Sequence, residues 1–392
     1  MKVIARTCVV LLLLSGLVIL PQCQKKAEIH EVKIGGLFDL TGATHEISVP
    51  YADGIRNYID YINEKGGING RKVKLIEVDY GYLIPRAEAA YENFIKVEKV
   101  HAILGWGTGD TEMLRSKIAK DRIPFMSASY SSKLGIINEA PYNFLIGVTY
   151  SDQMRIALRF ILDQWKDKSR RPKVAFIYSD TAFGKSPIAD GYTYAASHGI
   201  DVVADEIVTL DAREAIDQLS RIKAMEADYA ILQETTWAAS VILKYARKLE
   251  LKTRFIGLNW CADEKLIALA GEAAEGFTGT APFIFTDVNI PGIRKILEYN
   301  RRKGVDIEGY ILRHIQGWTT AEVMLEGVRR AGNDLSGSGI KKGLESIRGY
   351  NTGGITAPVT FAPSDHRGCK KLKLVRVVDG KWQLITNYIA AE

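Results

Sequence analysis

From residue 30 onward, short apolar runs rich in β-branched residues alternate with longer segments of helical period. A strand is predicted over residues 32–38 and a helix over residues 51–64, where apolar side chains recur at i, i+3, i+4 and i+7 starting from Ile55. Alternation of this kind is typical of βαβ units, whose strands run parallel and whose helices cover the sheet. The pattern therefore predicts an α/β fold.

The alternation occurs in two successive series, separated by a break around residues 148–151. The chain has 392 residues, which is too long for one average domain and suits two lobes of ordinary size. Two open α/β sheets would hold a ligand at the carboxyl ends of their strands, where loops face each other across a cleft. Beyond the first strand, strands are predicted over residues 73–78, 102–104, 124–127, 174–178, 202–207, 229–232 and 255–258, with a late hairpin over 372–378 and 382–385.

The N-terminus has the layout of a signal peptide. Lys2 and Arg6 precede an unbroken apolar run over residues 9–20. This run is shorter than the about 20 apolar residues that a membrane-spanning helix needs. We therefore predict that residues 1–22 are a cleaved signal and that the mature chain lies in the periplasm or on the outer face of the cell membrane. Cys23 stands where a lipoprotein carries its lipid-acceptor cysteine, but the residue before it is not small, so a lipid anchor and ordinary cleavage both stay open.

The part of the chain that follows this segment holds two cysteines, Cys261 and Cys369. In an oxidising compartment they could form one disulfide bond, and two buried free thiols are an equally open alternative. The formal net charge is +6, and the basic runs contain no interleaved aromatic residues. We therefore expect no nucleic-acid partner.

Motifs for nucleotide, metal or hydrolytic chemistry are incomplete. Residues 179–186 (SDTAFGKS) follow a predicted strand, but Ser179 replaces the first glycine of a P-loop. The six histidines show no paired ligand spacing, and no nucleophile-elbow motif occurs. We expect no cofactor, no metal and no catalytic residue, so the chain is predicted not to be an enzyme.

Several strings, in a fixed order along almost the whole mature chain, carry a resemblance to a known family. They are residues 32–35 (VKIG), 62–73 (INEKGGINGRKV), 251–257 (LKTRFIG), 271–276 (GEAAEG) and 360–368 (TFAPSDHRG). The chain resembles the type I periplasmic binding proteins, specifically the branched-chain amino acid (leucine/isoleucine/valine-binding) family of ABC transporter receptors. The resemblance implies two Rossmann-like lobes with parallel-rich sheets, joined by a three-strand hinge.

The family pattern implies three passages of the chain between the lobes, near Thr149, Ala281 and Pro358. Lobe 1 would comprise residues 30–149 and 281–358, and lobe 2 residues 150–280 and 359–392. A small carboxylate-containing ligand, either an amino acid or a related acid or amide, would bind in the cleft and close the lobes. Its partners would be the permease subunits of an ABC importer in the inner membrane. A ligand-sensing subunit of a membrane signalling protein is the alternative, because it would use the same cleft.

In this family the first lobe grips a ligand carboxylate with hydroxyls and backbone N–H groups at loop-to-helix junctions, where the helix N-terminus carries partial positive charge. The matching loops here are residues 105–111 (GWGTGDT) and 127–132 (SASYSS). We predict that Thr108, Ser129 and Ser131 contact the carboxylate and that Trp106 and Tyr130 form apolar walls. Helix capping and turn formation are the alternative explanation for any one of these hydroxyl residues.

The second lobe departs from the pattern of the amino-acid binders. In those proteins an acidic residue after the strand predicted here at 255–258 pairs with the ligand ammonium, and the nearest match in this chain is Asn259. A neutral amide cannot supply that ion pair. The matching loops also offer Phe183, Thr235 and Thr236 as ligand contacts. Either Glu234 or Asp263 supplies the missing charge from a different direction, or the ligand lacks an α-amino group.

Overall fold

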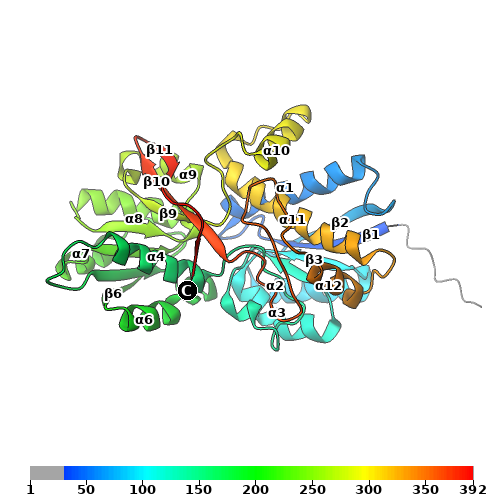
Figure 1. Ribbon diagram of the computed structural model, residues 1–392, viewed down its shortest axis with the longest axis horizontal. Coiled ribbons are helices and arrows are strands. Elements are labelled where there is room, and N and C mark those ends of the chain that lie inside the picture. Colours follow the sequence, from blue (N-terminus) through cyan, green and yellow to red (C-terminus); the bar gives the residue numbers. More distant parts are fainter. Residues whose placement is uncertain (1–30, 392) are drawn as a thin grey trace, which may run out of the picture.

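The computed structural model describes residues 31–391, which form two lobes lying side by side (Figure 1). One lobe is built on a four-stranded sheet and the other on an eight-stranded sheet. This arrangement confirms the predicted α/β class. The predicted signal segment 1–22 and Cys23 lie outside the described residues. Within residues 31–391, none of the helices is both long and apolar enough to cross a membrane.

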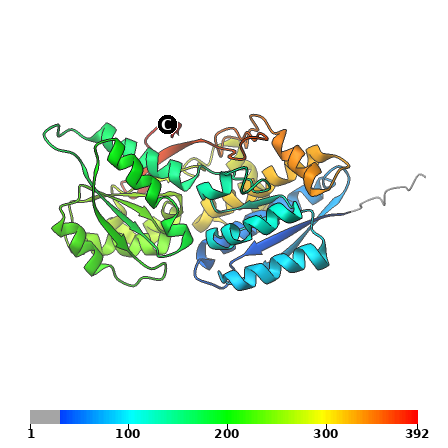
Figure 2. The ribbon, with the colours of Figure 1, turned by 90° about the horizontal axis from the view of Figure 1, so that it is seen from below.

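The sheet of lobe 1 consists of four parallel strands in the order β2-β1-β3-β4. β1 is central, and its Val32, Ile34 and Leu37 side chains have no exposed surface because helices cover both faces of the sheet (Figure 2). The bounds are β1 (Glu31–Phe38), β2 (Lys72–Asp79), β3 (Ala102–Gly105), β4 (Phe125–Ser127), α1 (His45–Glu64), α2 (Ile84–Asn93) with a π-helical extension (Phe94–Glu98), α3 (Thr108–Asp121), and the later helices α10 (Pro291–Arg302), α11 (Ile311–Ala331) and α12 (Gly337–Glu345).

Two glycines allow α1 and α11 to pack with their backbones almost touching. A Cβ atom on Gly54 of α1 would lie 2.0 Å from the carbonyl oxygen of His314, and one on Gly317 of α11 would lie 1.8 Å from that of Tyr51. Both distances are far below van der Waals contact. The helix that arrives late in the sequence is therefore fixed to lobe 1 along its length.

The sheet of lobe 2 has the order β11-β10-β9-β8-β7-β5-β6, with β12 paired to β10. β5 to β9 run parallel, whereas β10 is antiparallel to β9, β11 and β12. The bounds are β5 (Lys173–Tyr178), β6 (Asp201–Ile207), β7 (Tyr229–Gln233), β8 (Arg254–Gly257), β9 (Thr278–Ala281), β10 (Lys371–Val378), β11 (Lys381–Leu384), β12 (Ile389–Ala390), α4 (Tyr150–Gln164), α5 (Ala182–Lys185), α6 (Ile188–Ser197), α7 (Ile216–Ala224), α8 (Thr236–Lys248) and α9 (Glu264–Ala270). Short 3-10 turns lie at η2 (Ser132–Gly135), η3 (Asn259–Cys261), η4 (Gly271–Ala274) and η5 (Glu308–Tyr310).

The order of the elements places the passages between the lobes after β4, after β9 and before β10. Isolated bridges pair Tyr350 with Val359 and Leu145 with Arg367, and His366 contacts Asn143 and Glu345. Residues 359–367 thus still touch lobe 1, which favours a last boundary after Arg367 and not near Pro358. The residue limits of the two lobes stay a prediction.

Several elements of lobe 2, among them α4 and β9, do not appear among the predicted ones. α4 begins at the break that the sequence presents, where the hydroxyl of Thr149 caps the helix by accepting from the amide of Asp152. β9 has the sequence TGTA, whose small and polar residues give no apolar run. The strand is formed because β8 and β10 supply pairing partners on both sides.

Cys261 and Cys369 are both buried and both free, which rules out the disulfide alternative. The thiol of Cys261 donates to the carbonyl oxygen of Glu234 at 3.0 Å, and that of Cys369 donates to the carbonyl oxygen of Ala357 at 3.2 Å. Burial raises the pKa of Cys369 to about 12 and that of Cys261 still higher, so both thiols are protonated.

Candidate functional site

A cavity lies between the lobes, at the carboxyl ends of strands from both sheets. It holds about 280 Å³ of space free of protein atoms, counting the part open to solvent. The centres of water-sized molecules can occupy only about 20 Å³ of this space, so the cavity is narrow in this arrangement of the lobes. Lobe 1 contributes Thr44, Ile47, Tyr82, Trp106, Gly107, Thr108 and Ala128, and lobe 2 contributes Tyr150, Phe183, Thr235 and Trp260.

The loop after β1 reaches the cavity because Asp39 folds it back on itself. The buried Asp39 carboxylate accepts from the amides of Gly42 and Thr44 at 2.6 and 2.7 Å, and from the Thr44 hydroxyl at 2.7 Å. The Thr44 hydroxyl in turn accepts from the indole N–H of Trp106 at 2.8 Å. These bonds place Thr44 and the first turn of α1, including Ile47, at the cavity wall.

A small cluster of hydroxyls forms the polar end of the cavity. The side-chain oxygens of Thr108 and Ser129 are 2.8 Å apart, and both residues are buried. Burial raises the pKa of Tyr150 to about 12, although hydrogen bonding from Trp260, Thr108 and Ser129 opposes the shift. The Tyr150 hydroxyl is therefore neutral. α3 begins at Thr108, so the positive end of a helix dipole borders the same place.

Asp110 lies in the first turn of α3, just behind the wall. A Cβ atom on Gly107 would meet the Asp110 carboxylate oxygen at 2.2 Å and the Tyr80 hydroxyl at 2.5 Å, so the missing side chain leaves room for both. Burial raises the pKa of Asp110 to about 6, against the opposing effect of hydrogen bonds from backbone N–H groups in this turn. Some of the backbone N–H groups at this helix terminus therefore bond the Asp110 carboxylate and are not available to a ligand.

Aromatic rings make up most of the remaining wall. Trp106 and Trp260 approach edge to face at 5.1 Å between ring centroids, and Tyr150 packs on Phe183 in the same way at 5.5 Å. Trp260 also stacks on Tyr130 at 6.3 Å with an interplanar angle of 11°. A ligand in this cavity meets mainly apolar surface.

Asn259 does not line the cavity. Its side-chain oxygen accepts from the amide of Gln153 at 3.0 Å, and its backbone N–H donates to the Gln153 oxygen at 3.0 Å. Gln153 also accepts from the Thr280 hydroxyl at 2.7 Å. The position that matches the acidic residue of amino-acid binders is therefore part of a buried amide network beside the cavity.

Neither of the two alternative acids lines the cavity. Glu234 has no exposed surface, and both of its carboxyl oxygens lack a hydrogen-bond partner, so burial raises its pKa well above the ordinary value. Asp263 forms an ion pair with Arg313 at 2.8 Å. The set of lining residues contains no carboxylate.

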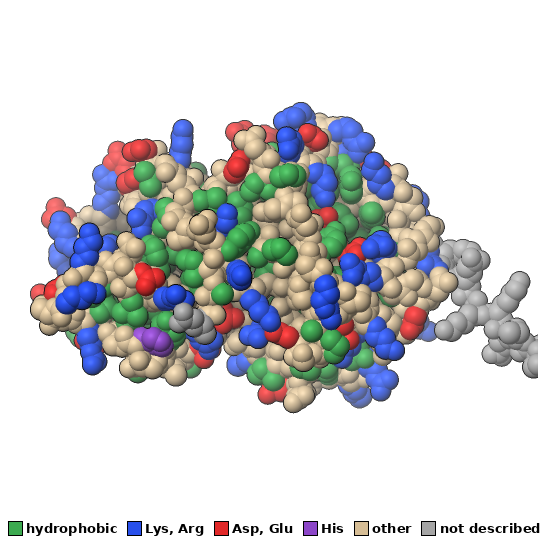
Figure 3. All heavy atoms as spheres, viewed as in Figure 1, with side chains coloured by type: hydrophobic (Ala, Val, Ile, Leu, Met, Phe, Trp, Pro, Cys, Tyr) green, Lys and Arg blue, Asp and Glu red, His purple; other side chains and the backbone are tan. Residues whose placement is uncertain are grey.

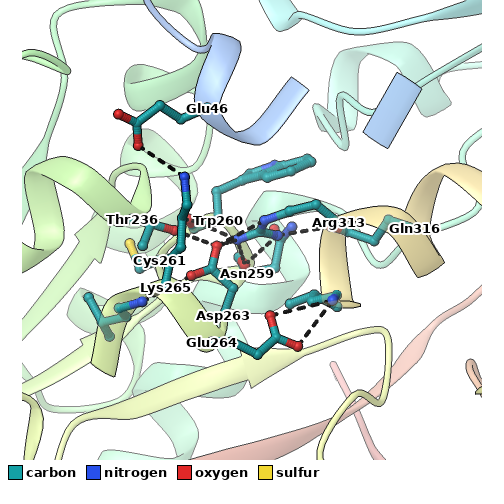
Figure 4. Close-up of polar contacts among 12 residues, drawn as sticks. Glu46, Thr236, Asn259, Trp260, Cys261, Asp263, Glu264, Lys265, Arg313 and Gln316 are labelled. Atoms are coloured by element: carbon teal, nitrogen blue, oxygen red, sulfur yellow. Dashed lines mark hydrogen bonds and ion pairs between the residues drawn. The ribbon is translucent and has the colours of Figure 1, made fainter. Parts of the chain in front are cut away.

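Arg313 and Trp260 belong to a polar network that the sequence did not point to (Figure 4). The guanidinium of Arg313 lies over the Trp260 ring, 4.6 Å from its centroid, and donates to the carbonyl oxygen of Trp260 at 3.2 Å. The indole N–H of Trp260 donates to the Tyr150 hydroxyl at 2.9 Å. A buried arginine is therefore linked to the cavity wall through one aromatic side chain.

The structure brings four of the predicted residues to the cavity wall: Trp106, Thr108, Phe183 and Thr235. The other five lie behind it. Ser129 and Tyr130 support Thr108 and Trp260, Ser131 donates to Glu112 at 2.6 Å, and Thr236 donates to Asp263 at 2.6 Å, while Asn259 contacts Gln153. The lining residues that the sequence did not indicate are Thr44, Ile47, Tyr82, Tyr150 and Trp260, together with the backbone positions Gly107 and Ala128.

Known proteins match this chain in sequence and in fold. A family model described as periplasmic binding protein matches residues 31–381. The chain belongs to the periplasmic binding protein family. Its members are solute-binding receptors and not enzymes, which confirms the prediction on that point and the predicted family resemblance.

Individual relatives of this periplasmic binding protein are distant in sequence and similar in fold. A Leu/Ile/Val-binding protein of Citrobacter freundii is 23% identical over 79% of this chain and 81% of its own. The structure of an ABC transporter substrate-binding protein from Aeropyrum pernix is 30% identical, with a TM-score of 0.86 over 92% of this chain and 96% of that one. A branched-chain amino acid ABC transporter structure from Thermus thermophilus, with bound valine, is 25% identical with a TM-score of 0.85 and the same coverage.

Proposed function

We propose that this protein is the extracytoplasmic receptor of an ABC importer and that it binds a small carboxylate with an apolar or aromatic body and no protonated amine. The observation that carries the proposal is the make-up of the cavity wall: hydroxyls and a helix N-terminus at one end, aromatic rings elsewhere, and no carboxylate among the lining residues. These three features together support the proposed ligand class.

The hydroxyl end supports recognition of a carboxylate. Thr108, at the start of α3, and Ser129 share one hydrogen bond, and a hydroxyl that gives up its contact with Tyr150 can donate to a ligand oxygen. Hydrogen bonds to a charged acceptor are stronger than neutral ones, and the dipole of α3 favours an anion here.

The absence of an acidic lining residue argues against an α-ammonium group. An ammonium ion taken from water into a largely apolar cavity needs a paired charge or several acceptors to offset its lost hydration. Asn259 is held by Gln153, Glu234 is enclosed and protonated, and Asp263 is paired with Arg313. The branched-chain amino acids in the names of the relatives therefore form the second candidate class, which the experiment below includes.

The importer role and the location rest on the family and on the N-terminal sequence. Named relatives are amino-acid binding proteins and ABC transporter binding proteins, and residues 1–22 have the layout of an export signal. We propose that the permease subunits in the inner membrane are its partners. Both a lipid anchor at Cys23 and ordinary cleavage of the signal are compatible with this proposal.

Thermal-shift measurements with matched pairs of compounds test the ligand class. Leucine is compared with 4-methylpentanoate, and phenylalanine with 3-phenylpropanoate, which differ only in the amino group. A ligand that binds only the native state raises the melting temperature by mass action. At a ligand concentration of a hundred times Kd, the free energy of unfolding increases by about 2.7 kcal/mol. We expect shifts with the two deaminated acids and none with the amino acids. Shifts with leucine or phenylalanine alone would show that the proposed class is wrong.

The amide of 4-methylpentanoate serves as the control for the carboxylate. It retains the apolar body and one oxygen but carries no charge. Binding of the amide as tight as that of the acid would contradict recognition of an anion at Thr108.

A further inference from the structure

Arg313 extends from lobe 1 into the body of lobe 2. Its side chain is only 2% exposed and lies against the η3 turn, where it bonds the Asp263 carboxylate at 2.8 Å and the Trp260 carbonyl oxygen at 3.2 Å. Figure 4 shows it pointing from α11 toward the turn that carries Asn259, Trp260 and Cys261. A guanidinium in such a position is enclosed by the opposite lobe.

Arg313 moves with lobe 1 because α11 cannot separate from α1. The backbone contacts of Gly54 with His314 and of Gly317 with Tyr51 lie within about one helical turn after Arg313. The neighbouring residue His314 adds side-chain contacts to Asn57 and Asn300 of the same lobe at 3.4 and 3.1 Å.

The groups that receive Arg313 are fixed to lobe 2. The Thr236 hydroxyl, at the start of α8, donates to Asp263 at 2.6 Å and lies 3.1 Å from the Trp260 carbonyl oxygen. Asp263 also caps α9 by accepting from the Leu266 amide at 3.2 Å, and its carbonyl oxygen accepts from Trp382 at 2.8 Å. The ion pair between Arg313 and Asp263 therefore joins the two lobes and exists only while they are together.

Trp260 connects this ion pair to the cavity. One face of the indole carries the Arg313 guanidinium, its edge donates to Tyr150, and its ring lines the space between the lobes. We propose that Arg313 is a positioning residue: on lobe closure it enters lobe 2, seats Trp260 against the ligand and so completes the cavity. This inference rests on the proposed function for the ligand. It means that one side chain, Arg313, couples closure of the lobes to capture of the ligand.

Because the ion pair is buried, its contribution to ligand affinity is large, and it arises only after the lobes have closed. With the lobes apart, both charged groups would be hydrated, so the pair stabilises only the closed form. Loss of one partner leaves a buried charge unpaired, which in interfaces of this kind weakens affinity by about thirtyfold or more and acts mainly on dissociation. The effect of Arg313 on a ligand is therefore expected in the dissociation rate.

The first test compares Arg313→Met with Lys265→Ala. Lys265 pairs with Glu46 across the same two lobes at 3.6 Å, but the two side chains are 41% and 43% exposed, so the loss of this pair should have little effect. For 4-methylpentanoate, we expect Arg313→Met to raise the dissociation rate by about thirtyfold with a nearly unchanged association rate. A purely structural defect would lower the melting temperature but would not raise the dissociation rate while leaving the association rate unchanged. Wild-type dissociation in the Arg313→Met protein would overturn the proposal.

The second variant removes both charges. In Asp263→Asn the one side-chain oxygen can still accept from the Leu266 amide, while the NH2 group replaces the oxygen that accepts from Thr236 and Arg313. In the double variant Arg313→Met/Asp263→Asn no unpaired charge remains, and we expect tighter binding than in Arg313→Met alone. No recovery in the double variant would contradict the role of the ion pair.

A measurement on the ligand-free protein separates this proposal from the ligand proposal. Hydrogen exchange at residues 259–270 of the ligand-free protein reports how often the lobes close and protect this segment. It should be faster in Arg313→Met than in the wild type, because the variant closes less often, and unchanged in Lys265→Ala. If no acid of the panel binds, the proposed ligand class fails while the exchange result still decides the role of Arg313. Equal exchange in all three proteins would overturn that role.

Discussion

At the scale of single residues, the site shows the limits of what the sequence indicates. Trp106 and Thr108 could be predicted because they follow a buried strand of a parallel sheet, where ligands bind. Ser129 and Asn259 also follow strands, but their side chains lie behind the wall. A sequence identifies the loop that borders a cavity, and only the packed structure decides which of its side chains faces inward. Arg313 gave no signal at all, since its partners come from a different lobe.

Asp110 predicts a pH dependence of ligand binding. Its pKa of about 6 means that it is charged at pH 8 and largely protonated at pH 5. An anion behind Gly107 repels a ligand carboxylate by on the order of 1 kcal/mol, so Asp110→Asn should bind 4-methylpentanoate about fivefold more tightly at pH 8. The gain should shrink as the pH falls through 6, because the wild-type residue then loses its charge. The ratio of the two affinities, measured by calorimetry at each pH, cancels the titration of the ligand itself.

Weaker binding by Asp110→Asn at pH 8 would contradict this expectation. It would indicate that Asp110 attracts a cationic group, as an amino acid would carry. The titratable groups that interact with Asp110 are Tyr80 and Tyr82, and burial raises the pKa of both, so they remain neutral in this range and do not contribute to the pH dependence.

Glu234 predicts a pH dependence of stability. Its pKa in the folded state lies well above the ordinary value, so between pH 4.5 and the folded pKa the folded state binds more protons than the unfolded state. Stability must then fall as the pH rises through that window, by up to about 1.4 kcal/mol per pH unit from this one group. Glu234→Gln, neutral at every pH, should melt at a higher temperature than the wild type at pH 8 and by a smaller margin at pH 5.

Glu214→Gln is the control for that experiment, because Glu214 is exposed. It should change the melting temperature equally little at both pH values. Glu264, whose pKa burial raises to about 8, contributes a loss in the same direction and remains present in both variants.

At the scale of elements, apolar runs located the strands β1 to β8 well, since a strand buried on both faces of a parallel sheet has few polar positions. β9 was missed because its partners, and not its own residues, make it a strand. α1 begins at His45, ahead of the predicted start at residue 51, and contains Pro50. The Asp39 contacts with Thr44 stabilise that earlier start, and no local propensity predicts them.

The contact between α1 and α11 predicts a large effect of a single methyl group. Gly317→Ala would place a Cβ atom 1.8 Å from the Tyr51 carbonyl oxygen, so the two helices must move apart. Overpacking of this kind destabilises by about 1–3 kcal/mol. Gly309→Ala is the matched control, since nothing lies within 4 Å of its added Cβ atom. Urea unfolding should show a lower midpoint for the first variant only, and equal midpoints would show that the helices can separate without cost.

At the scale of the whole molecule, the two lobes share one chain that visits each of them twice, and the ligand cavity lies where they meet. Acidic and basic side chains are interspersed over both lobes on the face shown in Figure 3. The sequence alone predicted the two-lobed α/β architecture because the apolar strand runs and the helical periods that indicate it are local patterns repeated along the chain. The closed arrangement of the lobes depends on contacts between residues far apart in sequence, such as Arg313 and Asp263, which no local pattern reveals.

The position of β10 beside β9 also decides when lobe 2 can finish folding. Ribosomes make β5 to β9 first, and until residues 371–378 follow, β9 has one side without a pairing partner. An open strand edge attracts other chains and promotes aggregation. In the exported chain that we propose, which would cross the membrane from its N-terminus, this vulnerable stage falls after the first lobe-2 strands have emerged, and folding chaperones on the far side of the membrane would act at that time. Truncation before residue 371 would remove the strand that ends this exposure.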